Sequence, residues 1–137
     1  MESMMMLYEA VKEKLGTTYD NVFYQTMREN EPGDVGIYLY ESANDREDIG
    51  GDAIYDCIKV HVQVNCDKSV QGMQKALDYL SKFTRRMENE QCAISGVTFI
   101  EARHQGPRAL AIGKNQFDIL ICRSVIDLKY VFDSENN

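Results

Sequence analysis

The spacing of the hydrophobic positions changes abruptly near the middle of this chain. From residue 58 to residue 65 the even positions are apolar and the odd positions are polar. A period of two is typical of a strand with one buried face. From residue 70 onward the apolar positions fall at 70, 73, 77 and 80, with 76 and 83 on the same side, which is the spacing of an amphipathic helix. We therefore predict a strand over 54–66 followed directly by a helix over 70–87.

Weaker patterns predict the remaining elements. An apolar stripe over residues 4–15, followed by Gly16, predicts a helix over 2–15. Short apolar stretches at 22–27 and 35–40 flank the turn sequence Glu-Pro-Gly-Asp, so they are predicted to form a hairpin. Further strands are predicted over 94–104 and 117–132. Residues 41–52 and 105–116 are predicted to be loops.

The predicted order is α-β-β-β-α-β-β, which indicates the α+β class. We expect one mixed, largely antiparallel sheet of about five strands, with both helices packed on one face. Residues 1–132 should form a single domain and residues 133–137 a frayed tail. A sheet with an open face or a bare edge usually binds a partner.

Composition narrows the functional classes. The 137 residues carry a net charge of −7, which disfavours nonspecific binding to nucleic acid or to anionic membranes. No apolar run reaches the ~18 residues of a membrane span, so no membrane partner is expected. The four cysteines form no Cys-x-x-Cys pair and are expected to be reduced, buried thiols.

The chain lacks the residue patterns of common catalytic and metal sites. His104 has no cysteine within five residues, and Cys57, four residues before His61 on the same predicted strand, would lie roughly 13 Å along it, too far for a direct pair. The acidic segment 41–52 lacks the oxygen spacing of an EF-hand, and no P-loop, GxGxxG or GxSxG motif is present. We therefore predict no catalytic residues, no metal and no cofactor, and a protein that is not an enzyme.

Charge is segregated between the two predicted loops. Residues 41–52 contain five acidic residues and one arginine, whereas the region around 103–114 is locally basic. Surfaces of opposite charge on one subunit suit head-to-tail assembly. The predicted subunit or partner interface comprises Asp45, Glu47, Asp48, Asp52, Arg103, Arg108 and Lys114.

The chain also resembles a known family. The segment IKVHVQVNCDKSVQGMQKALDYLSKF (residues 58–83), and Pro107 and Gly113 ahead of the last strand at Phe117, are similar to the tail terminator proteins of long-tailed phages, often described as minor capsid proteins. The resemblance covers roughly residues 4–130. It implies a hexameric ring at the head–tail junction of the virion, assembled in the bacterial cytoplasm. It also implies that the ring stops tube growth, contacts the tail tube protein and the head-completion or connector proteins, and lets DNA pass without specific binding.

Three alternatives stay open on the sequence alone. The β-α-β succession around 54–104 would also suit a ferredoxin-like module that binds a small ligand on its sheet. A head–tail adaptor or stopper protein would lie in the same part of the virion. An enzyme with a thiol or carboxylate site is the third alternative.

Overall fold

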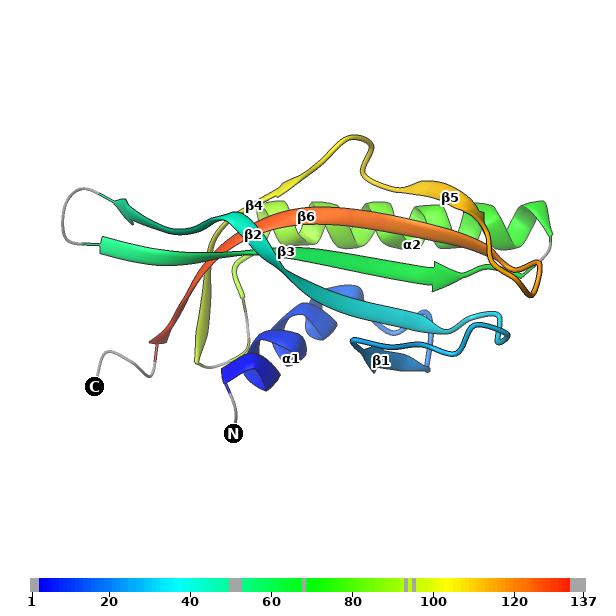
Figure 1. Cartoon of the computed structure of the whole chain (residues 1–137), viewed down its shortest axis with the longest axis horizontal. Helices are drawn as coiled ribbons and strands as arrows, with labels where there is room; N and C mark the ends of the chain where they lie inside the picture. Colours follow the sequence, from blue (N-terminus) through cyan, green and yellow to red (C-terminus); the bar gives the residue numbers. More distant parts are fainter. Residues whose placement is uncertain (1–2, 50–52, 68, 93, 95, 134–137) are drawn as a thin grey trace.

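The computed structural model describes residues 3–49, 53–67, 69–92, 94 and 96–133, and for residues 3, 43–49, 53 and 54 it describes the backbone path alone. Two helices and six strands follow one another along the chain (Figure 1). Their bounds are α1 Ser3–Leu15, β1 Val22–Tyr24, β2 Val35–Ile49, β3 Ala53–Asn65, α2 Val70–Asn89, β4 Val97–His104, β5 Leu110–Lys114 and β6 Leu120–Phe132. No helix within the described ranges is both long and apolar enough to cross a membrane.

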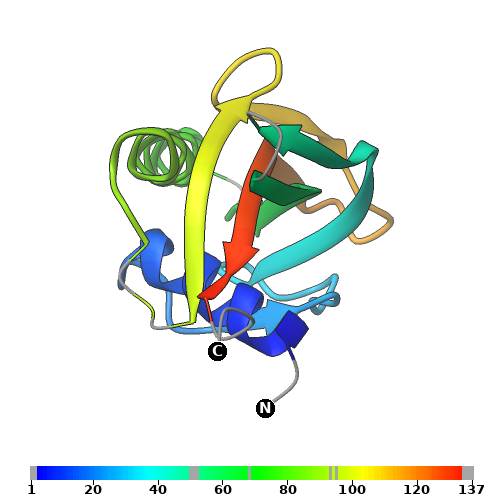
Figure 2. The same ribbon diagram turned by 90° about the vertical axis from the view of Figure 1, so that its left-hand side faces the viewer.

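The strands form one mixed sheet in the order β1-β2-β3-β6-β4, with β5 also paired to β6. All neighbouring pairs are antiparallel except β1 and β2. The predicted α+β class and the largely antiparallel sheet are therefore confirmed. In Figure 2 the sheet is strongly curved, with α2 beside β4 and α1 near the opposite end of that strand.

The structure differs from two predictions about the strands. The described residues contain six strands where about five were predicted, because Leu110–Lys114 pairs with β6 inside the predicted loop 105–116. The segments 22–27 and 35–40 do not form a hairpin, since β1 and β2 are parallel. Gln25 adopts a left-handed conformation (φ 62°) directly after β1, and the chain returns through residues 26–34 before β2 begins beside the start of β1.

The predicted acidic loop 41–52 is also wrong for most of its length. Residues 41–49 belong to β2, and Glu41 and residues 46–49 pair with β3, with a register irregularity between Glu41 and Arg46. Together with residues 53–56 of β3 they form a two-stranded projection, here called the arm, on the left in Figure 1. Acidic residues and the Gly50-Gly51 pair indicated a loop, but ladder hydrogen bonds between adjacent strands compensate for poor strand propensity.

One cluster of buried side chains joins the helices to one face of the sheet. It includes Leu7 and Val11 of α1, Leu80 and Phe83 of α2, Val60, Val62 and Val64 of β3, and Ile126 and Leu128 of β6. From Ile58 to Val64 the even-numbered residues of β3 are buried and the odd-numbered ones only partly buried, as the alternation predicts. The odd-numbered residues therefore face the other side of the sheet.

Local interactions determine where α2 begins and where α1 ends. Ser69 caps α2 by accepting a hydrogen bond from the Gly72 amide at 2.9 Å, and Asp67 lies so close that a Cβ on Gly72 would meet its carboxylate. Helix α1 ends at Leu15, and Gly16 follows with φ 79°, which confirms the predicted stop. The guanidinium of Arg86 in α2 donates to the last carbonyls of α1, which ties the two helices together.

Candidate interaction surfaces

The face of the sheet away from the core, here called the open face, carries mostly polar and aromatic side chains. Cross-strand neighbours define its rows: Tyr40, Lys59, Asp127 and Arg103 in one, and Cys57, Lys129 and Glu101 in another. A third row contains Tyr38, His61 and Val125, and a fourth contains Gln63, Arg123 and Leu110. The charged side chains in these rows are four cations and two carboxylates, so the open face is net basic on an acidic protein.

Two of these cations make no ion pair within the described part of the chain. Lys59 and Arg123 are half-buried, and neither makes an ion pair with any described residue. Asp127 lies opposite Lys59 in register, but its carboxylate accepts a hydrogen bond from the Gln105 side chain. The Nε atom of Arg123 is buried and has no hydrogen-bond partner among the described residues.

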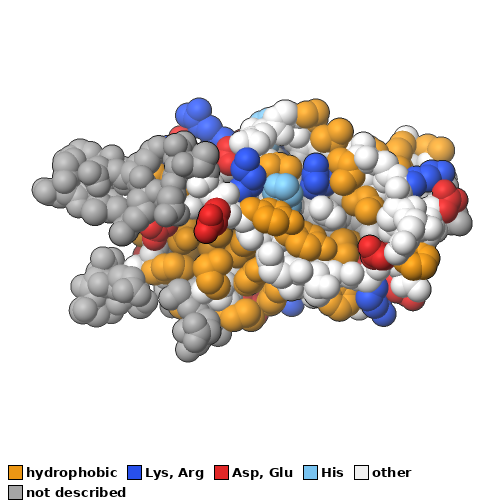
Figure 3. All heavy atoms as spheres, viewed as in Figure 1, with side chains coloured by type: hydrophobic (Ala, Val, Ile, Leu, Met, Phe, Trp, Pro, Cys, Tyr) orange, Lys and Arg blue, Asp and Glu red, His pale blue; other side chains and the backbone are white. Residues whose placement is uncertain are grey.

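His61 lies between these cations, and we call Lys59, His61 and Arg123 the basic strip. Burial lowers the pKa of His61, and the nearby charges of Arg123 and Lys59 lower it further. The imidazole is therefore neutral at pH 7, and the charge of the strip comes from the other two residues. Figure 3 shows a histidine between two basic side chains on this face, next to hydrophobic side chains. One of the aromatic neighbours is Tyr40, whose ring meets the imidazole edge-on at 4.7 Å between centroids.

A hollow of about 450 Å³ lies on the open face beside the strip, with Lys59 at its lining and with its other two cations, Arg103 and Lys129, paired. Glu101 accepts from both Arg103 and Lys129 at 3.2 Å. The hydrogen bond from Lys129, together with the charge of Arg103, lowers the pKa of Glu101, and hydrogen bonding to Tyr55 and Glu101 raises the pKa of Lys129. These groups stabilise one another, so this hollow offers less unsatisfied charge than the basic strip.

The three basic residues predicted for the interface do not form one patch. Arg103 lies in β4 and pairs with Glu101, Arg108 lies between β4 and β5 and pairs with Glu88, and Lys114 ends β5 and pairs with Asp118 at 3.3 Å. Each already has an acidic partner within the chain. The interface role assigned to them stays a prediction.

The acidic half of the predicted interface lies in the arm. The backbone of Asp45, Glu47 and Asp48 belongs to β2, and Asp52 lies outside the described residues. Residues 41–49 and 53–56 together contain five acidic residues and one arginine. The arm is therefore strongly acidic, whereas the open face is basic.

Glu88 of α2 holds the end of β4 and the following loop. Its carboxylate accepts from the His104 ring at 2.7 Å, from the His104 amide and from the Arg108 guanidinium. Burial raises the pKa of Glu88, but the hydrogen bonds from His104 and Arg108 outweigh it, and the pKa is lowered overall. Thr84, one turn earlier, donates to the Arg108 carbonyl at 3.2 Å, which makes this corner a structural anchor.

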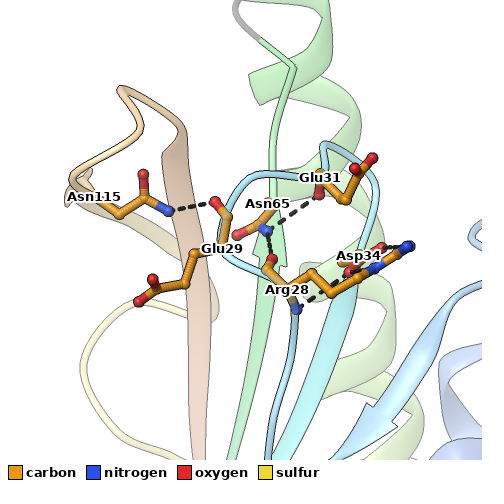
Figure 4. Close-up of polar contacts among 6 residues, drawn as sticks. All are labelled: Arg28, Glu29, Glu31, Asp34, Asn65 and Asn115. Atoms are coloured by element: carbon orange, nitrogen blue, oxygen red, sulfur yellow. Dashed lines mark hydrogen bonds and ion pairs between the residues drawn. The ribbon is translucent and has the colours of Figure 1, made fainter.

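A second polar network fixes the loop between β1 and β2 (Figure 4). The buried carboxylate of Asp34 accepts two hydrogen bonds from the Arg28 guanidinium, both at 2.9 Å. Asn65, at the end of β3, donates to the carbonyls of Arg28 and Glu31 at 2.6 and 3.1 Å. Asn115 donates to the Glu29 carbonyl at 2.7 Å, so β3, this loop and the β5–β6 turn are joined.

The described residues contain no assembly of groups suited to metal binding, since no three His, Cys, Asp or Glu side chains lie close enough to share an ion. The closest thiols are those of Cys66 and Cys122, 3.2 Å apart in the core. Burial and the mutual hydrogen bond raise the pKa of Cys66, which suits an unreactive thiol.

Sequence reasoning placed Lys59 and His61 on the polar side of their strand but did not identify the basic strip. Arg123 is far away in the sequence, and only the pairing of β3 with β6 brings it near.

No protein-family model matches this chain, and no curated protein matches it either.

Proposed function

We propose that this chain is a structural virion protein of the tail terminator type, which forms a ring on the head-proximal end of a phage tail tube. The observation that carries the proposal is the contrast between a projecting acidic arm and a net-basic open sheet face on the same subunit. Two unlike, complementary surfaces generate head-to-tail contacts, and such contacts close into rings when the rotation between subunits permits.

The resemblance in residues 58–83 and the absence of a metal-binding cluster among the described residues support the same proposal. In this role the ring stops tube growth and contacts the head-completion or connector protein at the head–tail junction. The overall charge of −7 disfavours tight binding of the DNA that passes through.

The test uses the full chain and the tail tube protein encoded in the same genome. Tubes assembled with the chain should be shorter and capped at one end in negative-stain images, and sedimentation should show a ring-sized species on or off the tube. Uncapped tubes of unchanged length, with a chain that sediments as a monomer throughout, would contradict the proposal.

One observation favours a second candidate, a ferredoxin-like module that binds a small ligand. The hollow of about 450 Å³ on the open face is large enough for such a ligand and is lined by Lys59, Arg103 and Lys129. A thermal-shift screen separates the two functions, because a ligand at 100 times its dissociation constant stabilises by about 2.7 kcal/mol. The terminator proposal predicts no such stabilisation.

A further inference from the structure

The basic strip is the only place on the described part of the open face where cations lack acidic partners. Arg103 and Lys129 share Glu101, whereas Lys59 and Arg123 make no ion pair with a described residue. Half-buried cations without counter-charges lose hydration on folding and gain little in return. A carboxylate supplied from outside the subunit would compensate them.

The same chain supplies such carboxylates on the arm. Five of the residues at positions 41–49 and 53–56 are acidic and one is basic. The arm continues β2 and β3 away from the body (Figure 1), so its acidic end lies away from the middle of its own sheet face. The complementary contact is therefore expected between two copies.

The two surfaces are of comparable length. Arg123 lies opposite Gln63, four residues along β3 from Lys59, so the strip spans roughly 13 Å at the rise of a strand. The paired positions Arg46–Ile49 of the arm extend roughly 10 Å. Tyr40, which is 43% exposed beside the strip, adds an aromatic surface that suits a subunit contact.

We propose that the acidic arm of one copy docks on the basic strip of a second copy, with Lys59 and Arg123 as the cations that receive it. This inference rests on the proposed function and specifies its subunit interface. The strip could also receive the phosphates of a nucleic acid, but the net charge of −7 opposes that partner. Nucleic-acid binding is therefore treated as a competing outcome.

Charge reversal on each surface, and on both together, tests the contact. Lys59→Glu with Arg123→Glu reverses the charge of the strip, and Glu47→Lys with Asp48→Lys reverses the charge at two positions of the arm. Each pair should weaken self-association on the order of tenfold, which corresponds to ~1.4 kcal/mol. The variant that carries all four substitutions should regain association to within about threefold of the wild type, because its surfaces are again complementary.

Association is measured by sedimentation velocity at ~50 and ~500 mM salt, and on tail tubes by co-sedimentation. The wild type should weaken at the higher salt, where exposed charges are screened. Lys82→Glu is the matched control, since Lys82 is exposed on α2 and forms an ion pair with Asp78, one turn earlier on the same helix. The milder pair Lys59→Gln and Arg123→Gln covers the case in which the reversed strip does not fold, and circular dichroism verifies each variant.

The outcomes separate the interface from the function. If the wild type assembles and neither pair of reversals changes assembly, the interface is wrong and the terminator proposal stands. If the wild type stays monomeric in solution and on tubes, both are wrong. If the strip variants lose binding to a single- or double-stranded oligonucleotide and assemble normally, the strip belongs to a nucleic acid and the interface is again wrong.

Discussion

The contact of Arg108 with Glu88 leads to a specific prediction about the stability of the folded chain. Arg108 belongs to the locally basic region predicted to be a contact surface, where a charge reversal would leave the fold unchanged. The structure instead places its guanidinium, 33% exposed, against the 17% exposed carboxylate of Glu88. We expect Arg108→Glu to destabilise the monomer itself, because it removes a charge-assisted hydrogen bond and puts a second carboxylate beside Glu88.

The magnitude follows from the burial of the pair. A hydrogen bond to a charged group contributes about 1.5–3 kcal/mol, and breaking a fully buried ion pair costs about 3–5 kcal/mol. This pair is only partly buried, so we expect a loss of about 2–3 kcal/mol. At about 4 °C per kcal/mol for a chain of this size, Tm should fall by about 8–12 °C.

Lys114→Glu is the matched control for this prediction. Lys114 also pairs with a carboxylate, that of Asp118, but both side chains are more than half exposed, so its reversal should change stability by no more than about 0.5 kcal/mol. Urea and thermal unfolding followed by circular dichroism measure both variants. A double-mutant cycle with Glu88→Gln and Arg108→Gln should give a coupling of about 1–2 kcal/mol. Equal stability of the two reversals, or no coupling, would refute the reasoning.

Three further perturbations test other parts of the structure. Phe83→Ala, in the fully buried core, should cost about 3–5 kcal/mol in urea unfolding, and a loss under 1 kcal/mol would contradict the core assignment. Asn65→Ala should cost about 2 kcal/mol, because two carbonyls of the β1–β2 loop lose their donor, and limited proteolysis should then cut residues 26–34 faster. The pKa of His61 is below 6.5 in the folded chain, so the unfolded chain binds the proton first and stability falls as the pH drops through 6.5. His61→Gln should flatten that part of the stability curve in urea titrations between pH ~5 and ~8.

The elements with strong periodicity were predictable because burial imposes the period. The even-numbered residues 58–64 of β3 and the apolar residues Ala76, Leu80 and Phe83 of α2 belong to the core, and both elements appear close to their predicted bounds. The arm was not predictable in this way, since its strands have acidic residues where a buried strand would have apolar ones. The arm forms because β2 and β3 continue to pair with each other beyond the part of the sheet that contacts the core. Strand β5 is short, follows Pro107 and contains the positive-φ Gly113, so its sequence indicates a loop, and the strand is recognised only by its pairing with β6.

The pairing of charged side chains was also not predictable from the sequence. The sequence identifies where cations are numerous, but only the tertiary structure determines which of them have acidic partners. Arg103, Arg108 and Lys114 form the basic stretch that was predicted to be an interface, and all three are paired within the chain. Lys59 and Arg123 stand in unremarkable stretches 64 positions apart. The pairing of β3 with β6 places them on adjacent strands, where neither makes an ion pair with a described residue. Because an unpaired, half-buried cation gains most from an external carboxylate, the strip has a stronger physical reason to bind a partner than the more basic stretch does.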